Sequence, residues 1–180
     1  TAVVIVNVLV WMMLISAVMG IGSASSILIA QAYGAGRPRQ LKTITGTSVA
    51  FVLGASVLMA LVGWFGSPLF VDLISTPEAA RELAITYLRA TAFSVLAIFP
   101  LVFITIMIRG MGDAKTPFRF TTLWIVLSLV FIPIVLLGPF GFPKLGIAGV
   151  AYSNTLAAII ALVALIVYMG RTRHALMLSG

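Results

Sequence analysis

The stretch ILIAQAYGAGRPR, residues 27–39, decides how this chain folds. An apolar run stops at Gly34 and Gly36, and arginines follow at once. Glycine is favoured just past a helix C-terminus because it adopts positive φ at no steric cost, and a proline soon afterwards prevents the helix from continuing. A dinucleotide-binding loop is excluded, since that fingerprint needs a third glycine and a preceding strand. The stretch therefore predicts the end of a membrane-spanning helix, with a positively charged loop beyond it.

Composition gives the same class for the whole chain. Of its 180 residues 62% are hydrophobic and only 8% are charged, and the mean hydropathy is +1.22. Soluble domains carry roughly 25% charged residues, because their surface faces water. The formal net charge is +7, but the basic residues lie between apolar segments and are not interleaved with base-stacking aromatics, so no nucleic-acid partner is expected. We predict an integral membrane protein.

Apolar stretches of 18 or more residues are typical of spanning helices. We expect an all-α polytopic bundle, with Ser67-Pro68 ending the second span, a mixed loop over residues 69–77, and a helix start at Thr76-Pro77-Glu78. Rows of small residues at every fourth position favour close helix packing in lipid. The predicted spans are residues 3–33, 43–66, 79–108, 118–138 and 147–170.

The loop RGMGDAKTP at 109–117 repeats the character of the opening stretch. Gly110 and Gly112 follow an apolar helix, with basic residues around Pro117. A phosphate loop is excluded, since the residue before the lysine would have to be glycine and is alanine. Asp113 is expected to accept hydrogen bonds from nearby backbone groups or to pair with a neighbouring cation such as Arg109. Both glycine-rich loops are interpreted as structural.

The distribution of positive charge predicts the orientation. Eight lysines and arginines lie in the loops after the first and third spans and in the C-terminal tail, against at most three on the opposite side. The positive-inside bias makes the first group cytoplasmic, so Thr1 starts outside and Gly180 ends in the cytoplasm. The chain opens inside an apolar run, with neither an initiator methionine nor a signal peptide, and we expect a fragment of a larger protein.

Catalysis is not expected. Cysteine is absent, and the one histidine, His174, follows the last span, so histidine and thiolate metal sites are not predicted. The four acids lie in loops or at helix starts, without the paired carboxylates that general acid–base chemistry needs. We expect no enzyme and no metal or organic cofactor.

Five polar or helix-breaking residues within the spans are candidates for a transport path. Arg89 lies well inside the third span, where a charge indicates function or snorkels back to the headgroups. Gln31 near the end of the first span is a path residue or an interfacial one. Asn154 needs a polar partner or a wet cavity. Ser128 and Pro133 interrupt the fourth span, and the proline bends the helix, either as a purely structural kink or as part of a gate.

Four motifs in order resemble one family, the multidrug and toxic compound extrusion (MATE) transporters. The likeness covers essentially the whole chain. Full-length members resemble two six-helix lobes, and the five spans of this chain resemble helices 2–6 of the first lobe; the matching part of the related second lobe is the alternative. The motifs are GIGSASSILIAQAYGAG at 20–36, YLR at 87–89, RGMGDAKTP at 109–117 and LGIAGVA at 145–151.

The resemblance implies export of small amphipathic, cationic drugs across the cytoplasmic membrane by alternating access, driven by H⁺ or Na⁺. Its partners would be the lipid bilayer, the missing first helix and the second lobe. Many members have Asn-x-x-x-Asp in the fifth helix; the matching positions here are Ser128 and Ile132, so the carboxylate is absent. The supporting polar residue of the sixth helix falls at Asn154. Coupling would then rest on segments outside this chain or on other groups.

A flippase for a lipid or lipid-linked oligosaccharide in a related fold is the alternative function. Such a protein would be expected to carry several cationic residues facing its cavity. Within the spans only Arg89 is a candidate for that role.

Overall fold

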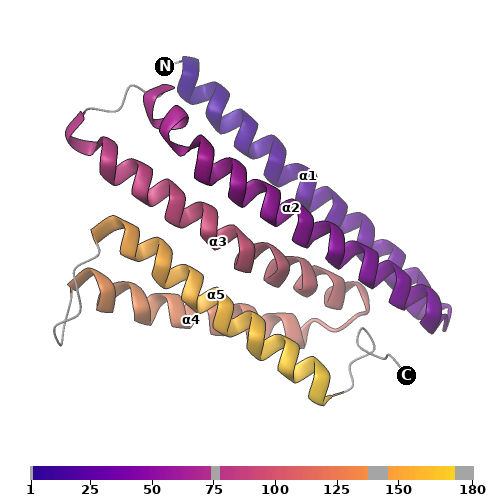
Figure 1. The fold of residues 1–180 in the computed structure, drawn as a ribbon. Helices are drawn as coiled ribbons and strands as arrows, with labels where there is room; N and C mark the ends of the chain where they lie inside the picture. Colours follow the sequence, from indigo (N-terminus) through magenta and orange to yellow (C-terminus); the bar gives the residue numbers. More distant parts are fainter. Residues whose placement is uncertain (1, 74–77, 138–145, 173–180) are drawn as a thin grey trace.

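The computed structural model describes residues 2–73, 78–137 and 146–172. This described part of the chain is built of helices (Figure 1), which confirms the all-α prediction. Four of these helices are long and apolar enough, over their described residues, to cross a membrane. The helices are α1 (Ala2–Gly34), α2 (Pro38–Leu73), α3 (Glu78–Gly110), α4 (Lys115–Leu137) and α5 (Gly146–Arg171).

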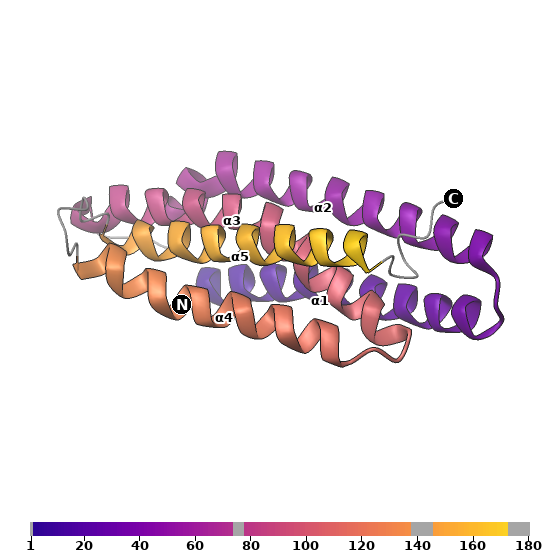
Figure 2. The same ribbon diagram turned by 90° about the horizontal axis from the view of Figure 1, so that it is seen from below.

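Helix α3 is the centre of the bundle. It packs against α1 and α2 on one side and against α5 and α4 on the other, as Figures 1 and 2 show from two directions. This placement fits the uncharged stretch of α3 between Arg89 and Arg109, as expected of a helix covered by neighbours on more than one face.

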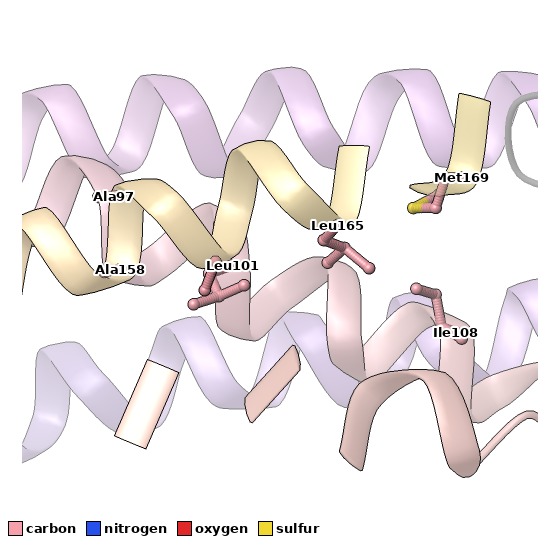
Figure 3. Packing of buried hydrophobic residues seen from close by; sticks show 7 residues of the cluster. Ala97, Leu101, Ile108, Ala158, Leu165 and Met169 are labelled. Atoms are coloured by element: carbon pink, nitrogen blue, oxygen red, sulfur yellow. The ribbon is translucent and has the colours of Figure 1, made fainter. Parts of the chain in front are cut away.

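Two apolar clusters hold α3 in place. One joins α3 to α5: at one end of it Ala97 of α3 lies beside Ala158 of α5, and larger side chains such as Leu101 and Leu165 follow towards the C-terminal ends of the two helices (Figure 3). Small side chains let the two backbones approach closely, which is the main route to helix packing where lipid removes the hydrophobic drive. The other cluster joins α1, α2 and α3 and contains Ile29, Ala32, Leu41, Val52, Phe103 and Met107.

The predicted rows of small residues have different outcomes. The row on α5 is buried along its whole length: Gly149, Ser153, Ala157 and Ala161. On α1, Gly22 faces Phe103 and Ile106 of α3, whereas the two later members of its row are exposed. The row on α2 at Gly46, Ala50 and Gly54 is exposed among the described residues. A row of small residues therefore lies at a helix contact in α5, partly so in α1, and not in α2.

The predicted end of the second span at Ser67-Pro68 is wrong. Helix α2 continues through Pro68 to Leu73, so residues 69–73 are helical and not a loop; residues 74–77 lie outside the described residues. Pro68 has no N–H for the carbonyl of Trp64, four residues earlier. The Ser67 hydroxyl donates to that oxygen at 2.9 Å instead, which satisfies the group that the proline leaves free.

The two glycine-rich loops end and start helices as predicted. Gly36 and Gly112 have φ of 64° and 85°, the left-handed region that favours glycine. Asp113 accepts backbone hydrogen bonds from Lys115 and Thr116, both at 3.0 Å, and so caps the N-terminus of α4. The predicted local backbone bonding of Asp113 is confirmed. Gly34 ends α1, Pro117 is fully buried in the first turn of α4, and Arg109 is exposed at the end of α3.

Gly110 has a packing role that the loop pattern did not reveal. A Cβ atom at this position would lie 2.6 Å from the main-chain oxygen of Ser26, closer than real side chains come. The backbones of α1 and α3 therefore meet here, and only glycine leaves room for the contact.

Candidate functional site: a neutral cavity between α3, α4 and α5

A cavity of about 390 Å³ lies between α3, α4 and α5, in the half of the bundle where α3 and α5 begin. Its walls are largely apolar, with two aromatic rings from α3 and a few polar groups, the usual composition of a small-molecule site. The lining residues are Tyr87, Thr91, Ser94, Val95, Ile98 and Phe99 of α3, Ile132 of α4, and Val150, Ala151 and Asn154 of α5.

Asn154 links the cavity to α4. Its Oδ1 accepts hydrogen bonds from the Trp124 indole Nε1 at 3.0 Å and from the Ser128 hydroxyl at 3.1 Å. An amide oxygen has two lone pairs, so both are occupied. The amide N–H groups make no hydrogen bond with any residue that the structure describes, and they are the donors that Asn154 can offer to a ligand. Ser128 and Asn154, named separately from the sequence, are thus in direct contact, while their role in transport stays a prediction.

A second polar pair joins α3 to α5 beside the cavity. The hydroxyls of Ser94 and Thr155 are hydrogen-bonded to one another, and both side chains are buried. One of the two hydroxyls donates to the other, and the second donates to the carbonyl four residues earlier in its own helix, either Ala90 at 3.0 Å from Ser94 or Ala151 at 2.7 Å from Thr155. These bonds satisfy the hydroxyls without water, so the pair closes the wall of the cavity and fixes the distance between the helices.

The sequence did not single out Trp124, Ser94 or Thr155. Hydroxyls in a spanning helix are common because they bond to their own backbone, and a tryptophan is typical of an interfacial anchor. A signal existed for Trp124: at i and i+4, Trp124 and Ser128 share one face of α4.

The cavity carries no charge. Each lining residue is apolar, aromatic, or a neutral alcohol or amide. Ile132 lines the wall at the position where the family resemblance would place a carboxylate. Among the described residues no group of three acids, histidines or cysteines could hold a metal ion. The site can therefore bind by shape, aromatic contact and a few hydrogen bonds.

Arg89 lies on the other side of α3. The lining residues of α3 recur at spacings of three and four along one helix face, and Arg89 falls two positions after Tyr87 and two before Thr91, on the opposite face. Its side chain packs on α2 instead: Nε donates to the Ser67 hydroxyl at 3.2 Å, and Cζ lies 5.4 Å from the centre of the Trp64 ring. Arg89 does not line this cavity.

Gln31 and Pro133 are not part of the polar network. Gln31 is exposed near the C-terminal end of α1, far along the bundle from the cavity. Pro133 follows the lining residue Ile132, and α4 continues through it to Leu137. The roles assigned to them, in the path and in gating, stay predictions.

Fold and cavity together define a polytopic helical membrane protein with a neutral, aromatic-walled pocket. The MatE family model matches residues 1–134. The chain belongs to the MatE family.

Curated relatives agree with this assignment. The chain is 38% identical over 164 residues to the "Probable multidrug resistance protein YoeA" of Bacillus subtilis (strain 168), a match that covers 91% of this chain and 35% of the relative. It is 32% identical over 143 residues to "Probable multidrug resistance protein YpnP" of the same organism, covering 79% of this chain and 31% of that protein. The chain thus spans about a third of the length of these relatives.

A solved structure has the same fold. A crystal structure of a MATE mutant superposes with a TM-score of 0.80 at 23% sequence identity, over 96% of this chain and 38% of the other. The helix arrangement described above is therefore that of a MATE protein over a little more than a third of its length.

Proposed function

We propose that the intact protein exports small amphipathic cations across the cytoplasmic membrane and that the cavity between α3, α4 and α5 is part of the transport path. Support comes from the family and from relatives whose names describe probable multidrug resistance proteins. The observation that carries the proposal is the cavity itself. Tyr87 and Phe99 offer aromatic surface within it, which suits an organic cation, and Asn154 offers hydrogen-bond donors.

The wider proposal retains the expected mechanism. Export occurs by alternating access between this group of helices and the rest of the protein, in exchange for H⁺ or Na⁺, with the C-terminal end of the chain in the cytoplasm. Concentrated positive charge at that end of the bundle supports this orientation.

The coupling ion binds elsewhere in this proposal. A coupled proton is usually carried by a carboxylate or an imidazole, and the lining residues contain neither. A sodium ion needs several free oxygen ligands, whereas Oδ1 of Asn154 already accepts two hydrogen bonds. We therefore infer that this cavity takes the drug, while ion coupling uses residues outside its wall.

Flipping of a lipid or lipid-linked oligosaccharide is less well supported. A phosphate-bearing substrate would favour cationic groups in the cavity wall. The lining residues carry none, and Arg89, the candidate, lies on the far face of α3.

The test uses a matched pair of substitutions on α5. Val150→Trp fills the cavity, whereas Val163→Trp places the same indole on an exposed position of the same helix. Each variant of the intact protein is expressed in cells that lack other drug exporters, and the accumulation of a cationic dye is followed with and without the ion gradient. We expect Val150→Trp to accumulate dye like cells without the protein and Val163→Trp to export it like the parent.

Two outcomes would contradict the proposal. If the parent protein leaves dye accumulation unchanged across a panel of cationic dyes, export of this substrate class is wrong. If the parent exports dye and Val150→Trp, present in the membrane at normal level, exports equally well, the cavity is not part of the path.

A further inference from the structure

The face of α3 that carries Arg89, opposite the cavity, has no assigned role. Here the guanidinium lies against the Trp64 ring, and one of its three nitrogens, Nε, is bonded to Ser67. The two terminal nitrogens have no hydrogen-bond or ion-pair partner among the residues that the structure describes. The guanidinium of arginine keeps its positive charge in proteins. A half-buried cation with free donors is thus fixed in one place by two contacts with α2.

The protein carboxylates near this end of the bundle do not neutralise Arg89. Asp72 of α2 is held by Arg81, whose Nε and Nη2 bond its two oxygens at 2.8 and 3.1 Å. Glu82 lies on α3 but forms no ion pair with Arg89 in the described part of the chain. The described residues thus supply no anion to the free guanidinium edge.

The depth of Arg89 indicates which anion lies within reach of this edge. The 19 residues between Arg89 and Arg109 carry no charge, and at 1.5 Å per residue they span about 28 Å. This length matches the hydrocarbon core of a bilayer, about 30 Å thick. With Arg109 at one membrane interface, Arg89 lies at the other, which is the level of the phospholipid phosphates.

The surface beside Arg89 suits an acyl chain. Trp64 is 44% exposed, and its neighbours on α2, Leu61 and Phe65, are 49% and 75% exposed. Tryptophan is enriched at membrane interfaces, where its ring meets both headgroup and hydrocarbon. An apolar ridge thus continues from the charged group towards the membrane centre.

We propose that Arg89 and Trp64 form a binding site for the phosphate of a phospholipid in the leaflet next to the α2–α3 connection. The terminal guanidinium nitrogens donate to phosphate oxygens in the paired geometry that arginine favours. Trp64 holds the guanidinium plane by a cation–π contact and, with Leu61, covers the first part of the acyl chain. Ser67 fixes the third nitrogen, so the free edge of the guanidinium points away from α2.

The experiment measures lipid binding by native mass spectrometry of the intact protein released from detergent. The probes are phosphatidylglycerol, the diacylglycerol with the same chains, and inorganic phosphate. We expect phosphatidylglycerol to bind best and Arg89→Ala to weaken it about tenfold, the loss of one charge-assisted contact. Arg81→Ala, which removes a nearby exposed arginine paired with Asp72, is the matched control and should bind like the parent.

A second variant protects the test against misfolding. Trp64→Leu keeps an apolar side chain but removes the cation–π contact, and we expect weaker phosphatidylglycerol binding with an unchanged helical circular dichroism signal. Diacylglycerol binding equal to that of phosphatidylglycerol would show an apolar site only. Inorganic phosphate binding as tightly as the lipid would show a free-anion site. Either result, or equal losses in Arg89→Ala and Arg81→Ala, would overturn the proposal.

Discussion

Replacement of Gly63 by alanine tests how closely α2 and α3 are packed. A Cβ at Gly63 would lie 2.7 Å from the Cβ of Ala92, whereas carbon atoms in good contact are about 3.5–4.0 Å apart. The helices would have to separate locally by about 1 Å. Overpacking of this kind costs about 1–3 kcal/mol, which outweighs the gain of up to about 1 kcal/mol that alanine brings to a helix interior over glycine.

The control and the rescue come from the same structure. At Gly54, also in α2, an added Cβ would have no described atom within 4 Å, so Gly54→Ala is expected to keep the propensity gain without the clash. Ala92→Gly removes the opposing methyl group, and the double variant Gly63→Ala, Ala92→Gly should recover most of the loss. Contacting residues are expected to be non-additive in this way.

Unfolding in mixed micelles of increasing dodecyl sulfate content, followed by circular dichroism, measures the effect. We expect Gly63→Ala to unfold at a lower dodecyl sulfate fraction than both Gly54→Ala and the double variant. Equal midpoints for Gly63→Ala and Gly54→Ala would refute the close contact of α2 and α3 at this point.

Two further predictions concern the cavity and the glycine-rich loop before α4. Asn154→Leu leaves the Trp124 indole N–H without its acceptor, while the Ser128 hydroxyl can turn to its own backbone. We expect stability to fall by about 0.5–1.5 kcal/mol, the range of hydrogen bonds within membrane bundles, in the same unfolding titration. The tryptophan emission spectrum should also change, and an unchanged spectrum would count against the contact. Asp113→Ala removes the cap of α4 and should cost about 1 kcal/mol, whereas Asp113→Asn keeps an acceptor oxygen and should lose less; equal losses would assign the effect to charge and not to capping.

The helices and the ends of the two glycine-rich loops could be predicted from the sequence because their signals are local. Length and apolar composition predict a spanning helix, and the glycine turn with Asp113 two and three residues before the bonded amides predicts a cap. Ser128 and Asn154 were identified one by one as polar residues that need partners in lipid. Their contact with each other depends on how α4 packs on α5, which local pattern does not contain.

The wrong prediction at Pro68 and the open alternatives at Arg89 also have physical reasons. Pro68 predicts a helix stop, but a single serine hydroxyl takes over the carbonyl that the proline leaves free, and the helix continues. The sequence predicts equally that Arg89 lines a cavity or snorkels, because the sequence of one helix does not show which of its faces the neighbouring helices cover. Only the position of α2 relative to α3 shows that its side chain faces Trp64.

The central position of α3 has a mechanical consequence. Helices α4 and α5 pack mainly on each other and on α3, and α1 and α2 do the same from the opposite side. A displacement of one helix pair relative to the other is therefore transmitted through the side chains of α3, the helix that both pairs contact. Substitutions in α3 distant from the cavity are expected to change the coupling between the two pairs, even where no ligand touches them.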